Sequence, residues 1–226
     1  MGIGTARRRR HGIRVTRNAA PTDAAQPPGE LSDEPSKANL DHCRRCELFE
    51  HATQGVAGEG PRDARILLVG EQPGDEEDLQ GRPFVGPAGR LLRELLDEAG
   101  LPPAQVFMTN AVKHFFFEPR GKRRIHKTPP QRHIASCHAW LEAELARVHP
   151  AVIVTLGATA PAAVSGGKIA IATARTKKLA SPEGTPIVAT YHPSAALRAP
   201  DHDARAKLRA ALLSDLKRAA RMAGRA

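Results

Sequence analysis

The sequence has 226 residues, enough for one sizeable domain with flanking tails. Its 34 lysines and arginines outnumber its 24 aspartates and glutamates, and the net charge of +10 favours a polyanionic partner such as nucleic acid as much as it does a merely basic enzyme. No apolar run approaches the roughly 18 residues of a membrane span, and none follows the basic N-terminus as in a secretory signal. These absences exclude a membrane protein and indicate the cytoplasm, where cysteines seldom form disulfides.

Residues 1–37 are predicted to be disordered, because an arginine-rich start and a proline-rich stretch bury too little apolar surface. Residues 38–222 are predicted to form the globular domain, in which strands and helices alternate along the chain. This alternation predicts a three-layer α/β/α sandwich around a central four-stranded, mainly parallel sheet. The strands are expected at residues 64–71, 105–112, 151–157 and 186–192, and the helices at 88–100, 130–148, 158–166 and 202–222.

Polar or glycine-rich sequence follows each of the four predicted strands. The first strand ends in GEQPGD, the second in TNAVKH, the third in TLGAT and the fourth in YHPSAALR. Because ligands of open α/β sheets bind beyond the carboxyl ends of the strands, these segments are expected to meet in one site. Glu71 and Asp75 are candidates there for acid–base or electrostatic roles, and Phe84 for stacking on a base, although each taken singly is more typical of a loop or core residue.

Three of these segments together resemble a known family. GEQPGDEEDLQGRPFVGPAGRLL, TNAVKH and HPSAALR are similar to the signature motifs of the uracil-DNA glycosylase superfamily, and most similar to those of its family-four, iron–sulfur branch. The resemblance covers roughly residues 40–220, which is the whole predicted domain. The basic run GKRRIHK (121–127) resembles the hallmark of the X-type members (UdgX), whose histidine attacks the sugar and stays bound to it.

The resemblance implies how uracil is recognised. The base must be flipped out of a duplex, or offered by a single strand, before an active site can reach it. Asn110 would pair with uracil O4 and N3–H through its amide, and Phe84 would stack on the ring. His192 would stabilise the negative charge that develops at uracil O2. The other residues expected to contact the substrate, through phosphates or through a loop at 194–198 that enters the duplex, are Asp75, Ser194, Arg198, Lys122, Arg123 and Arg124.

His126, the histidine of the basic run, is expected to capture the sugar in place of water. A nucleophilic imidazole must be neutral, and the surrounding cations are expected to keep it so. The resemblance assigns Glu71 to orient the ring or accept its proton, and Gln72 to hold the loop or the substrate. Because a C1′–N bond to a tightly held imidazole has no good route to hydrolysis, the expected product is a single-turnover protein–DNA adduct and free uracil. HFFFEPRGKRRIH departs from the family pattern in its three phenylalanines and short lead-in, and its length decides whether His126 reaches C1′.

Three cysteines and one histidine make up the expected metal centre. Cys43 and Cys46 are separated by two residues in CRRC, a spacing that suits a shared metal. Cys137 lies in the predicted helix at 130–148. The resemblance implies that His114 takes the place of a fourth cysteine and that the set holds a structural [4Fe–4S] cluster. The same ligands also suit zinc, which is the alternative cofactor.

Three functions are compatible with the sequence. The first is an X-type uracil-DNA glycosylase that becomes covalently linked to DNA through His126. The second is an ordinary multi-turnover family-four enzyme, and the third is a non-catalytic, metal-stabilised nucleic-acid-binding module. The set of Glu71, Asn110 and His192 argues against the third, because binding alone needs no such set. The expected partner is uracil-containing DNA, single-stranded in the first place and also double-stranded, and the expected state is a monomer.

Overall fold

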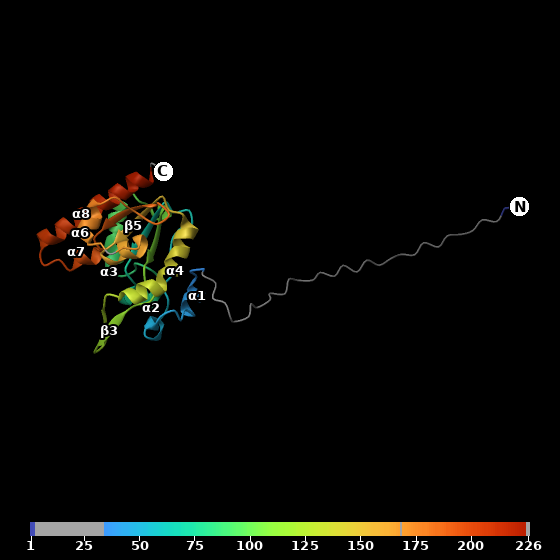
Figure 1. Ribbon diagram of the computed structural model, residues 1–226, viewed down its shortest axis with the longest axis horizontal. Helices are drawn as coiled ribbons and strands as arrows, with labels where there is room; N and C mark the ends of the chain where they lie inside the picture. The colour runs from blue at the N-terminus through green and yellow to red at the C-terminus, as the bar shows by residue number, and fades with distance from the viewer. Residues whose placement is uncertain (3–33, 168, 225–226) are drawn as a thin grey trace. The chain divides into compact units, whose positions relative to one another are not determined.

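Five strands form the central sheet, in the order β2-β1-β5-β7-β6 (Figure 1). The computed structural model describes residues 1–2, 34–167 and 169–224, so most of the predicted tail lies outside the described residues. The sheet lies within the unit that spans residues Leu31–Ala226. Its parallel strands are β1 (Ile66–Gly70), β2 (Val106–Asn110), β5 (Val152–Leu156) and β7 (Pro186–Thr190).

These parallel strands confirm the four that the sequence predicted and make the sheet mainly parallel. The fifth strand, β6 (Leu179–Ala180), pairs antiparallel with the edge of β7 and was not predicted. Two residues are too few to form the apolar run by which a strand is recognised in a sequence. The α/β sandwich is therefore confirmed, with one short strand added at its edge.

The predicted helices correspond to α3, α4, α5 and α8. The remaining helices are short and were not predicted, because five or six residues show no helical period. In full, the helices are α1 (Lys37–Asp41), α2 (Asp75–Gln80), α3 (Pro87–Glu98), α4 (Gln131–Val148), α5 (Thr159–Ser165), α6 (Ile171–Thr176), α7 (Pro193–Leu197) and α8 (His202–Ala223), with 3₁₀ turns at Glu47–Glu50 and Pro103–Gln105. Among the described residues, no helix has the length and apolar character needed to cross a membrane.

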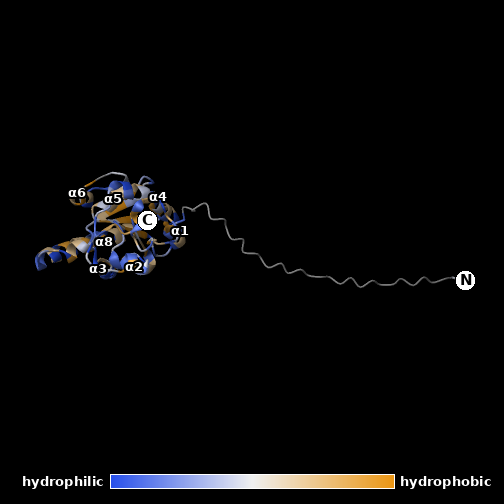
Figure 2. Ribbon diagram, turned by 90° about the horizontal axis from the view of Figure 1, so that it is seen from below, coloured by the Kyte–Doolittle hydropathy of each residue, from blue (hydrophilic) through white to orange (hydrophobic). Residues whose placement is uncertain are grey.

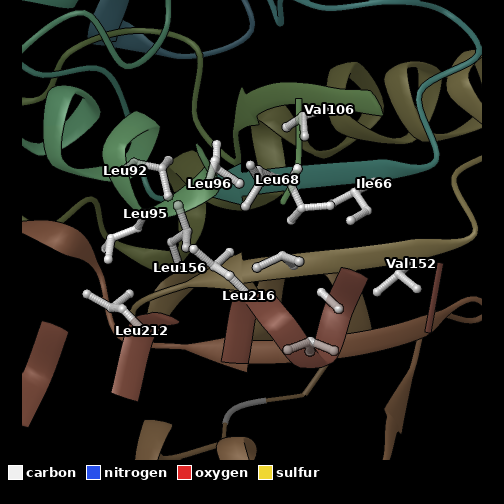
Figure 3. Packing of buried hydrophobic residues seen from close by; sticks show 14 of the residues in the cluster. Ile66, Leu68, Leu92, Leu95, Leu96, Val106, Val152, Leu156, Leu212 and Leu216 are labelled. Carbon is white, nitrogen blue, oxygen red and sulfur yellow. The ribbon is translucent and has the colours of Figure 1, made fainter. Parts of the chain in front are cut away.

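Strand β1 illustrates why both faces of the sheet are covered by helices. Its residues Ile66 and Leu68 pack with leucines of α3 and α8, while Leu67 and Val69 pack with α4 and α5. Successive side chains of a strand point to opposite faces, so one apolar run supplies both cores. The hydropathy colouring shows this as hydrophobic strands at the centre of the fold (Figure 2). Figure 3 shows the first core, where Leu92, Leu95, Leu96, Leu212 and Leu216 face the strands.

The basic run folds as a β-hairpin, which the sequence did not predict. Strands β3 (Phe117–Arg120) and β4 (Arg123–His126) pair antiparallel in a sheet of their own, and the hairpin projects from the domain (Figure 1). Gly121 occupies the turn at φ +58°, a conformation that glycine adopts without strain. The many charges and the proline of this segment hide the usual strand pattern.

The segment expected to be an inserting loop, residues 194–198, is instead mostly helical. Helix α7 begins with Pro193, whose fixed φ suits the first helical position, and His192 caps its N-terminus. Arg198 follows as the C-terminal cap. The expectation of a loop was wrong because it came from the family resemblance and left out the proline, which at this position starts a helix.

Candidate active site

The carboxyl ends of the parallel strands bring the predicted site residues together. Gly70 and Asn110 end β1 and β2 and are partners in the sheet register. A Cβ atom at Gly70 would collide with Asn110 Oδ1 and the ring of Phe84. The absence of a side chain at Gly70 therefore lets the amide of Asn110 and the ring of Phe84 meet above the end of β1.

Phe84 is held in an unusual backbone conformation inside the glycine-rich segment. Its φ of +54° is rare for a residue with a side chain, and its ring belongs to the apolar core. The carboxylate of Glu77 fixes this segment by accepting hydrogen bonds from the backbone N–H of Gly74 (3.1 Å) and of Gly86 (2.8 Å). Strain of this kind persists only where the surroundings impose it, so the position of the ring is strongly determined.

His192 follows β7 and presents one defined face of its ring. Its Nδ1 accepts a hydrogen bond from the backbone N–H of Ser194 at 3.2 Å, and Ser194 Oγ lies 2.8 Å from the same nitrogen. Nδ1 therefore carries no proton in the neutral ring, and Nε2–H is left as a donor. Burial, followed by the charges of His126 and Arg198, lowers the pKa of His192 to about 4, so the ring is neutral at pH 7. The Ser194 hydroxyl contacts the histidine, and its expected contact with a phosphate stays a prediction.

His126 ends β4 and faces Glu71, the residue after β1. The distance from His126 Nε2 to Glu71 Oε1 is 3.7 Å, and the other carboxylate oxygen of Glu71 accepts a hydrogen bond from Thr159. Burial lowers the pKa of His126, Glu71 opposes this, and Arg198 adds to it. The neutral state was correctly expected, but its predicted cause was wrong, since burial and Arg198 are responsible rather than the cations of the basic run.

Gln72 fixes the base of the hairpin. Its Nε2 donates to the carbonyl oxygens of Phe116 (3.0 Å) and Lys127 (3.1 Å), and its Oε1 accepts from the N–H of Phe116 (3.0 Å). The side chain of Gln72 thus bonds the residue before β3 and the residue after β4, where the hairpin joins the domain. Of the two roles expected for Gln72, these contacts correspond to holding the loop.

Arg124 joins the hairpin to α2. Its guanidinium contacts Asp75 Oδ1 and Asp78 Oδ2, each at 2.5 Å, and lies over the rings of Phe115 and Phe117. Two carboxylates neutralise this cation, so Arg124 and Asp75 contact each other, and the substrate contacts that the sequence suggested for both stay predictions. The remaining predicted cations of the run, Lys122 and Arg123, lie exposed near the hairpin tip.

The predicted metal ligands are only partly assembled. The thiols of Cys46 and Cys137 are hydrogen-bonded, which lowers the pKa of Cys46 to about 6 and raises that of Cys137. Cys43 Sγ accepts from Trp140 Nε1 at 3.4 Å, and His114 is buried, which lowers its pKa. Within the part of the chain that the structure describes, no three potential ligands surround a common point. The donor types fit a cluster or zinc, and the paired thiols are the nucleus of such a site.

Sequence reasoning missed four residues that contact this machinery. Glu144 had a detectable signal, because it occupies a buried position on the apolar face of α4, where a charge is unexpected. Lys113, Asp78 and Thr159 gave no comparable signal, because their roles depend on partners distant in the sequence. They are recognisable only from their contacts with Glu144, Arg124 and Glu71 respectively.

The sequence was compared with known proteins, and it matches the uracil DNA glycosylase superfamily over residues 57–217. A type-4 uracil-DNA glycosylase from Thermotoga maritima is 40% identical over 178 residues, which cover 78% of this chain and 87% of the relative. A protein of the same name from Archaeoglobus fulgidus is 33% identical over 196 residues, covering 81% of this chain and 89% of the relative.

The fold and the residues at its strand ends define a member of an α/β enzyme family with its site at the carboxyl edge of a parallel sheet. The chain belongs to the uracil-DNA glycosylase superfamily. Within that superfamily, the two relatives reported above carry the type-4 name, in agreement with the family-four resemblance of the motifs of this chain.

Proposed function

We propose that this protein excises uracil from DNA and that His126 then captures the sugar, as in the X-type branch. The observation that carries the proposal is the meeting of two neutral histidines at the strand ends. His126 is close enough to His192 to lower the pKa of that ring, and Arg198 lowers the pKa of both. The ring of His192 is suited to donate a hydrogen bond, and the ring of His126 is suited to donate an electron pair.

Uracil recognition is assigned to the pocket above Gly70. The amide of Asn110 offers one donor and one acceptor, which match uracil O4 and N3–H, whereas cytosine presents the opposite pattern. The ring of Phe84 adjoins this amide and supplies a surface on which a base stacks. A base inside a duplex cannot reach such a pocket, so the substrate is a flipped or single-stranded nucleotide.

Cleavage of the C1′–N1 bond leaves its electron pair on uracil and positive charge on the sugar. The Nε2–H of His192 is the group that we assign to uracil O2, where it stabilises the departing anion. A pKa of about 4 keeps this ring neutral at pH 7, and a neutral imidazole donates a hydrogen bond from Nε2–H without giving up its proton. The carboxylate of Glu71 lies on the side of His126 and stabilises the cationic sugar electrostatically.

Capture completes the proposed reaction. A ring nitrogen of neutral His126 donates its lone pair to C1′, forming a C1′–N bond, and the imidazolium loses its remaining N–H proton to Glu71 or solvent. The distance of 3.7 Å between Nε2 and Glu71 Oε1 leaves the ring free to turn toward the sugar. Gln72 and Arg124 support this step indirectly, because they anchor both ends of strand β4.

Turnover by water is the second candidate function, and one observation favours it. The side chain of His126 is 47% exposed, so water also has access to the position beside Glu71. In that case Glu71 would accept a proton from water and the protein would act as an ordinary type-4 glycosylase.

The wild-type protein is expected to form a heat-stable adduct with a uracil-containing single-stranded oligonucleotide. A denaturing gel measures the adduct as a retarded band, and chromatography measures free uracil in equal amount. The same oligonucleotide with thymine in place of uracil is the control and should give neither product. Alkali-labile abasic DNA with repeated turnover and no retarded band would replace the X-type proposal with the water mechanism. Absence of uracil release would contradict both.

We also propose that Cys43, Cys46, Cys137 and His114 hold a [4Fe–4S] cluster that stabilises the fold. The type-4 relatives and the paired thiols of Cys46 and Cys137 support this assignment. Protein purified without oxygen is expected to absorb near roughly 400 nm and to contain iron. Cys137→Ser should remove this absorbance and lower the melting temperature, whereas Ser136→Ala, at a partly exposed neighbour on α4, should change neither. Stoichiometric zinc in colourless protein would instead establish the zinc alternative.

A further inference from the structure

A buried ion pair lies directly beneath the residue assigned to uracil recognition. Lys113 and Glu144 are both fully buried, and Lys113 Nζ lies 2.6 Å from Glu144 Oε2. Removing two charges from water costs more than their attraction commonly returns, so a pair of this kind is weak evidence for stability alone. A buried pair that costs stability is expected to serve another purpose, such as fixing one arrangement of the groups around it.

The contacts of Lys113 identify what it fixes. Its ammonium also donates to Thr109 Oγ1 at 2.7 Å and to the carbonyl oxygen of Asn110 at 2.8 Å, so all three of its protons are used. Thr109 Oγ1 in turn donates to Glu144 Oε2 at 2.6 Å. The network therefore holds the side chain of Thr109 and the carbonyl group of Asn110, which lie on the two sides of the peptide bond that joins these residues.

Glu144 anchors this network to the rest of the fold. Its second oxygen accepts the backbone N–H of Gly58 at 2.8 Å, and its own backbone belongs to the long helix α4. On the other side, the N–H groups of Ala111 and Val112 bond the carbonyl oxygens of Gly70 and Glu71. The turn after β2 is thus held on one side by backbone hydrogen bonds to the end of β1 and on the other by Glu144 of α4.

We infer that Lys113 and Glu144 are positioning residues that hold Asn110 in the orientation required to read uracil. The inference rests on the proposed uracil-excising function and adds two residues to it that touch neither base nor sugar. The side chains of Thr109 and Asn110 point to opposite faces of the strand, so the network acts on the recognition amide only through the backbone. Displacement of a recognition group by about 1 Å can reduce a rate by about 10²-fold.

The double variant Lys113→Met/Glu144→Gln tests this inference without leaving a buried unpaired charge. Single-turnover uracil release is expected to fall about 10²-fold, as for a misplaced catalytic or binding group. Inhibition by free uracil should weaken in parallel, while affinity for a uracil-free oligonucleotide and the melting temperature should stay close to wild type. The matched control is Arg209→Met/Glu98→Gln, which removes an exposed ion pair between α8 and α3 and should leave all four measurements unchanged.

A second pair of variants decides the question if the double variant does not fold. Thr109→Val removes only the hydroxyl from the network, and Thr109→Ser keeps it. The valine variant is expected to release uracil more slowly and to bind free uracil more weakly than the serine variant at equal melting temperature. The inference would be overturned if the folded double variant and the folded Thr109→Val variant both released uracil at the wild-type rate and were inhibited by free uracil as the wild type is. That result would leave the proposed function unaffected. Absence of uracil release by the wild type would overturn both.

Discussion

Replacing His126 with alanine is expected to abolish the covalent adduct while uracil release continues. In the proposed mechanism, bond cleavage depends on Asn110 and His192, and only the capture of the sugar uses the imidazole of His126. Removal of the ring leaves a polar space beside Glu71 that a water molecule can fill. Water then captures the sugar, Glu71 accepts a proton, and the protein becomes able to turn over. The measurement is the ratio of retarded band to alkali-labile abasic product on a denaturing gel.

His138→Ala is the control for this experiment, because His138 is a half-exposed histidine on α4 whose Nε2 lies 3.2 Å from Glu142 Oε1. It should retain the adduct in full. Persistence of the adduct in His126→Ala would assign the capture to a different nucleophile. Loss of uracil release together with the adduct would show that His126 acts in bond cleavage, contrary to the division of labour proposed above.

The pH dependence of adduct formation follows from the lowered pKa of His126. An imidazole is nucleophilic only when neutral, and burial and Arg198 extend the neutral state below the ordinary value of 6.5. Adduct formation is therefore expected to persist under mildly acidic conditions, in which a free histidine would already be half protonated.

The sequence predicted the strands and helices that have a clear apolar pattern. It also predicted that a site lies beyond the carboxyl ends of the strands. Long apolar runs such as residues 66–70 can be recognised locally, and parallel strands necessarily bring their carboxyl ends to one edge. Glu71 follows β1, Asn110 ends β2 and His192 lies two residues after β7, so the strand ends point to all three, while the roles expected for them come from the family resemblance. An apolar run and the residues that follow it can both be read from a short stretch of sequence, without knowledge of contacts between distant residues.

The hairpin and its contacts could not be predicted for a physical reason. Whether Arg124 binds phosphate or a carboxylate depends on Asp78, which lies 46 positions away and reaches it only in the folded protein. The charge of a residue is visible in a sequence, but the partner that neutralises it is not. The same limit applies to Lys113, whose buried ammonium is balanced by Glu144 on a distant helix.

The cause expected for the neutral state of His126 was wrong, because it considered only neighbours in the sequence. The basic run was expected to supply the cations that keep the ring neutral. In the fold, the cation that affects His126 is Arg198, from a different segment. Electrostatic effects follow distance in space, so adjacency along the chain is a poor guide to them.

Replacing His192 with alanine is expected to reduce uracil release by about 10²–10³-fold, the typical effect of losing one donor to a developing anion. His192→Gln retains an N–H donor of similar reach and should lose less. The rate is measured as single-turnover release of free uracil with protein in excess. Equal rates in wild type and His192→Ala would remove His192 from the reaction, whereas unchanged affinity for uracil-free DNA in both variants would confirm that the surface is intact.

The stability of the wild type should also depend on His192 in acid. Its pKa in the folded protein, about 4, lies below the value of 6.5 expected when it is exposed, so protons bind more tightly to the unfolded chain. The associated stability is fully present above about pH 6.5 and is lost as the pH falls toward 4. The melting temperature of the wild type should therefore decrease more between these pH values than that of His192→Gln, which has no such group to titrate. Parallel curves would mean that the ring of His192 is accessible to protons in the folded state and is not the neutral donor that the reaction requires.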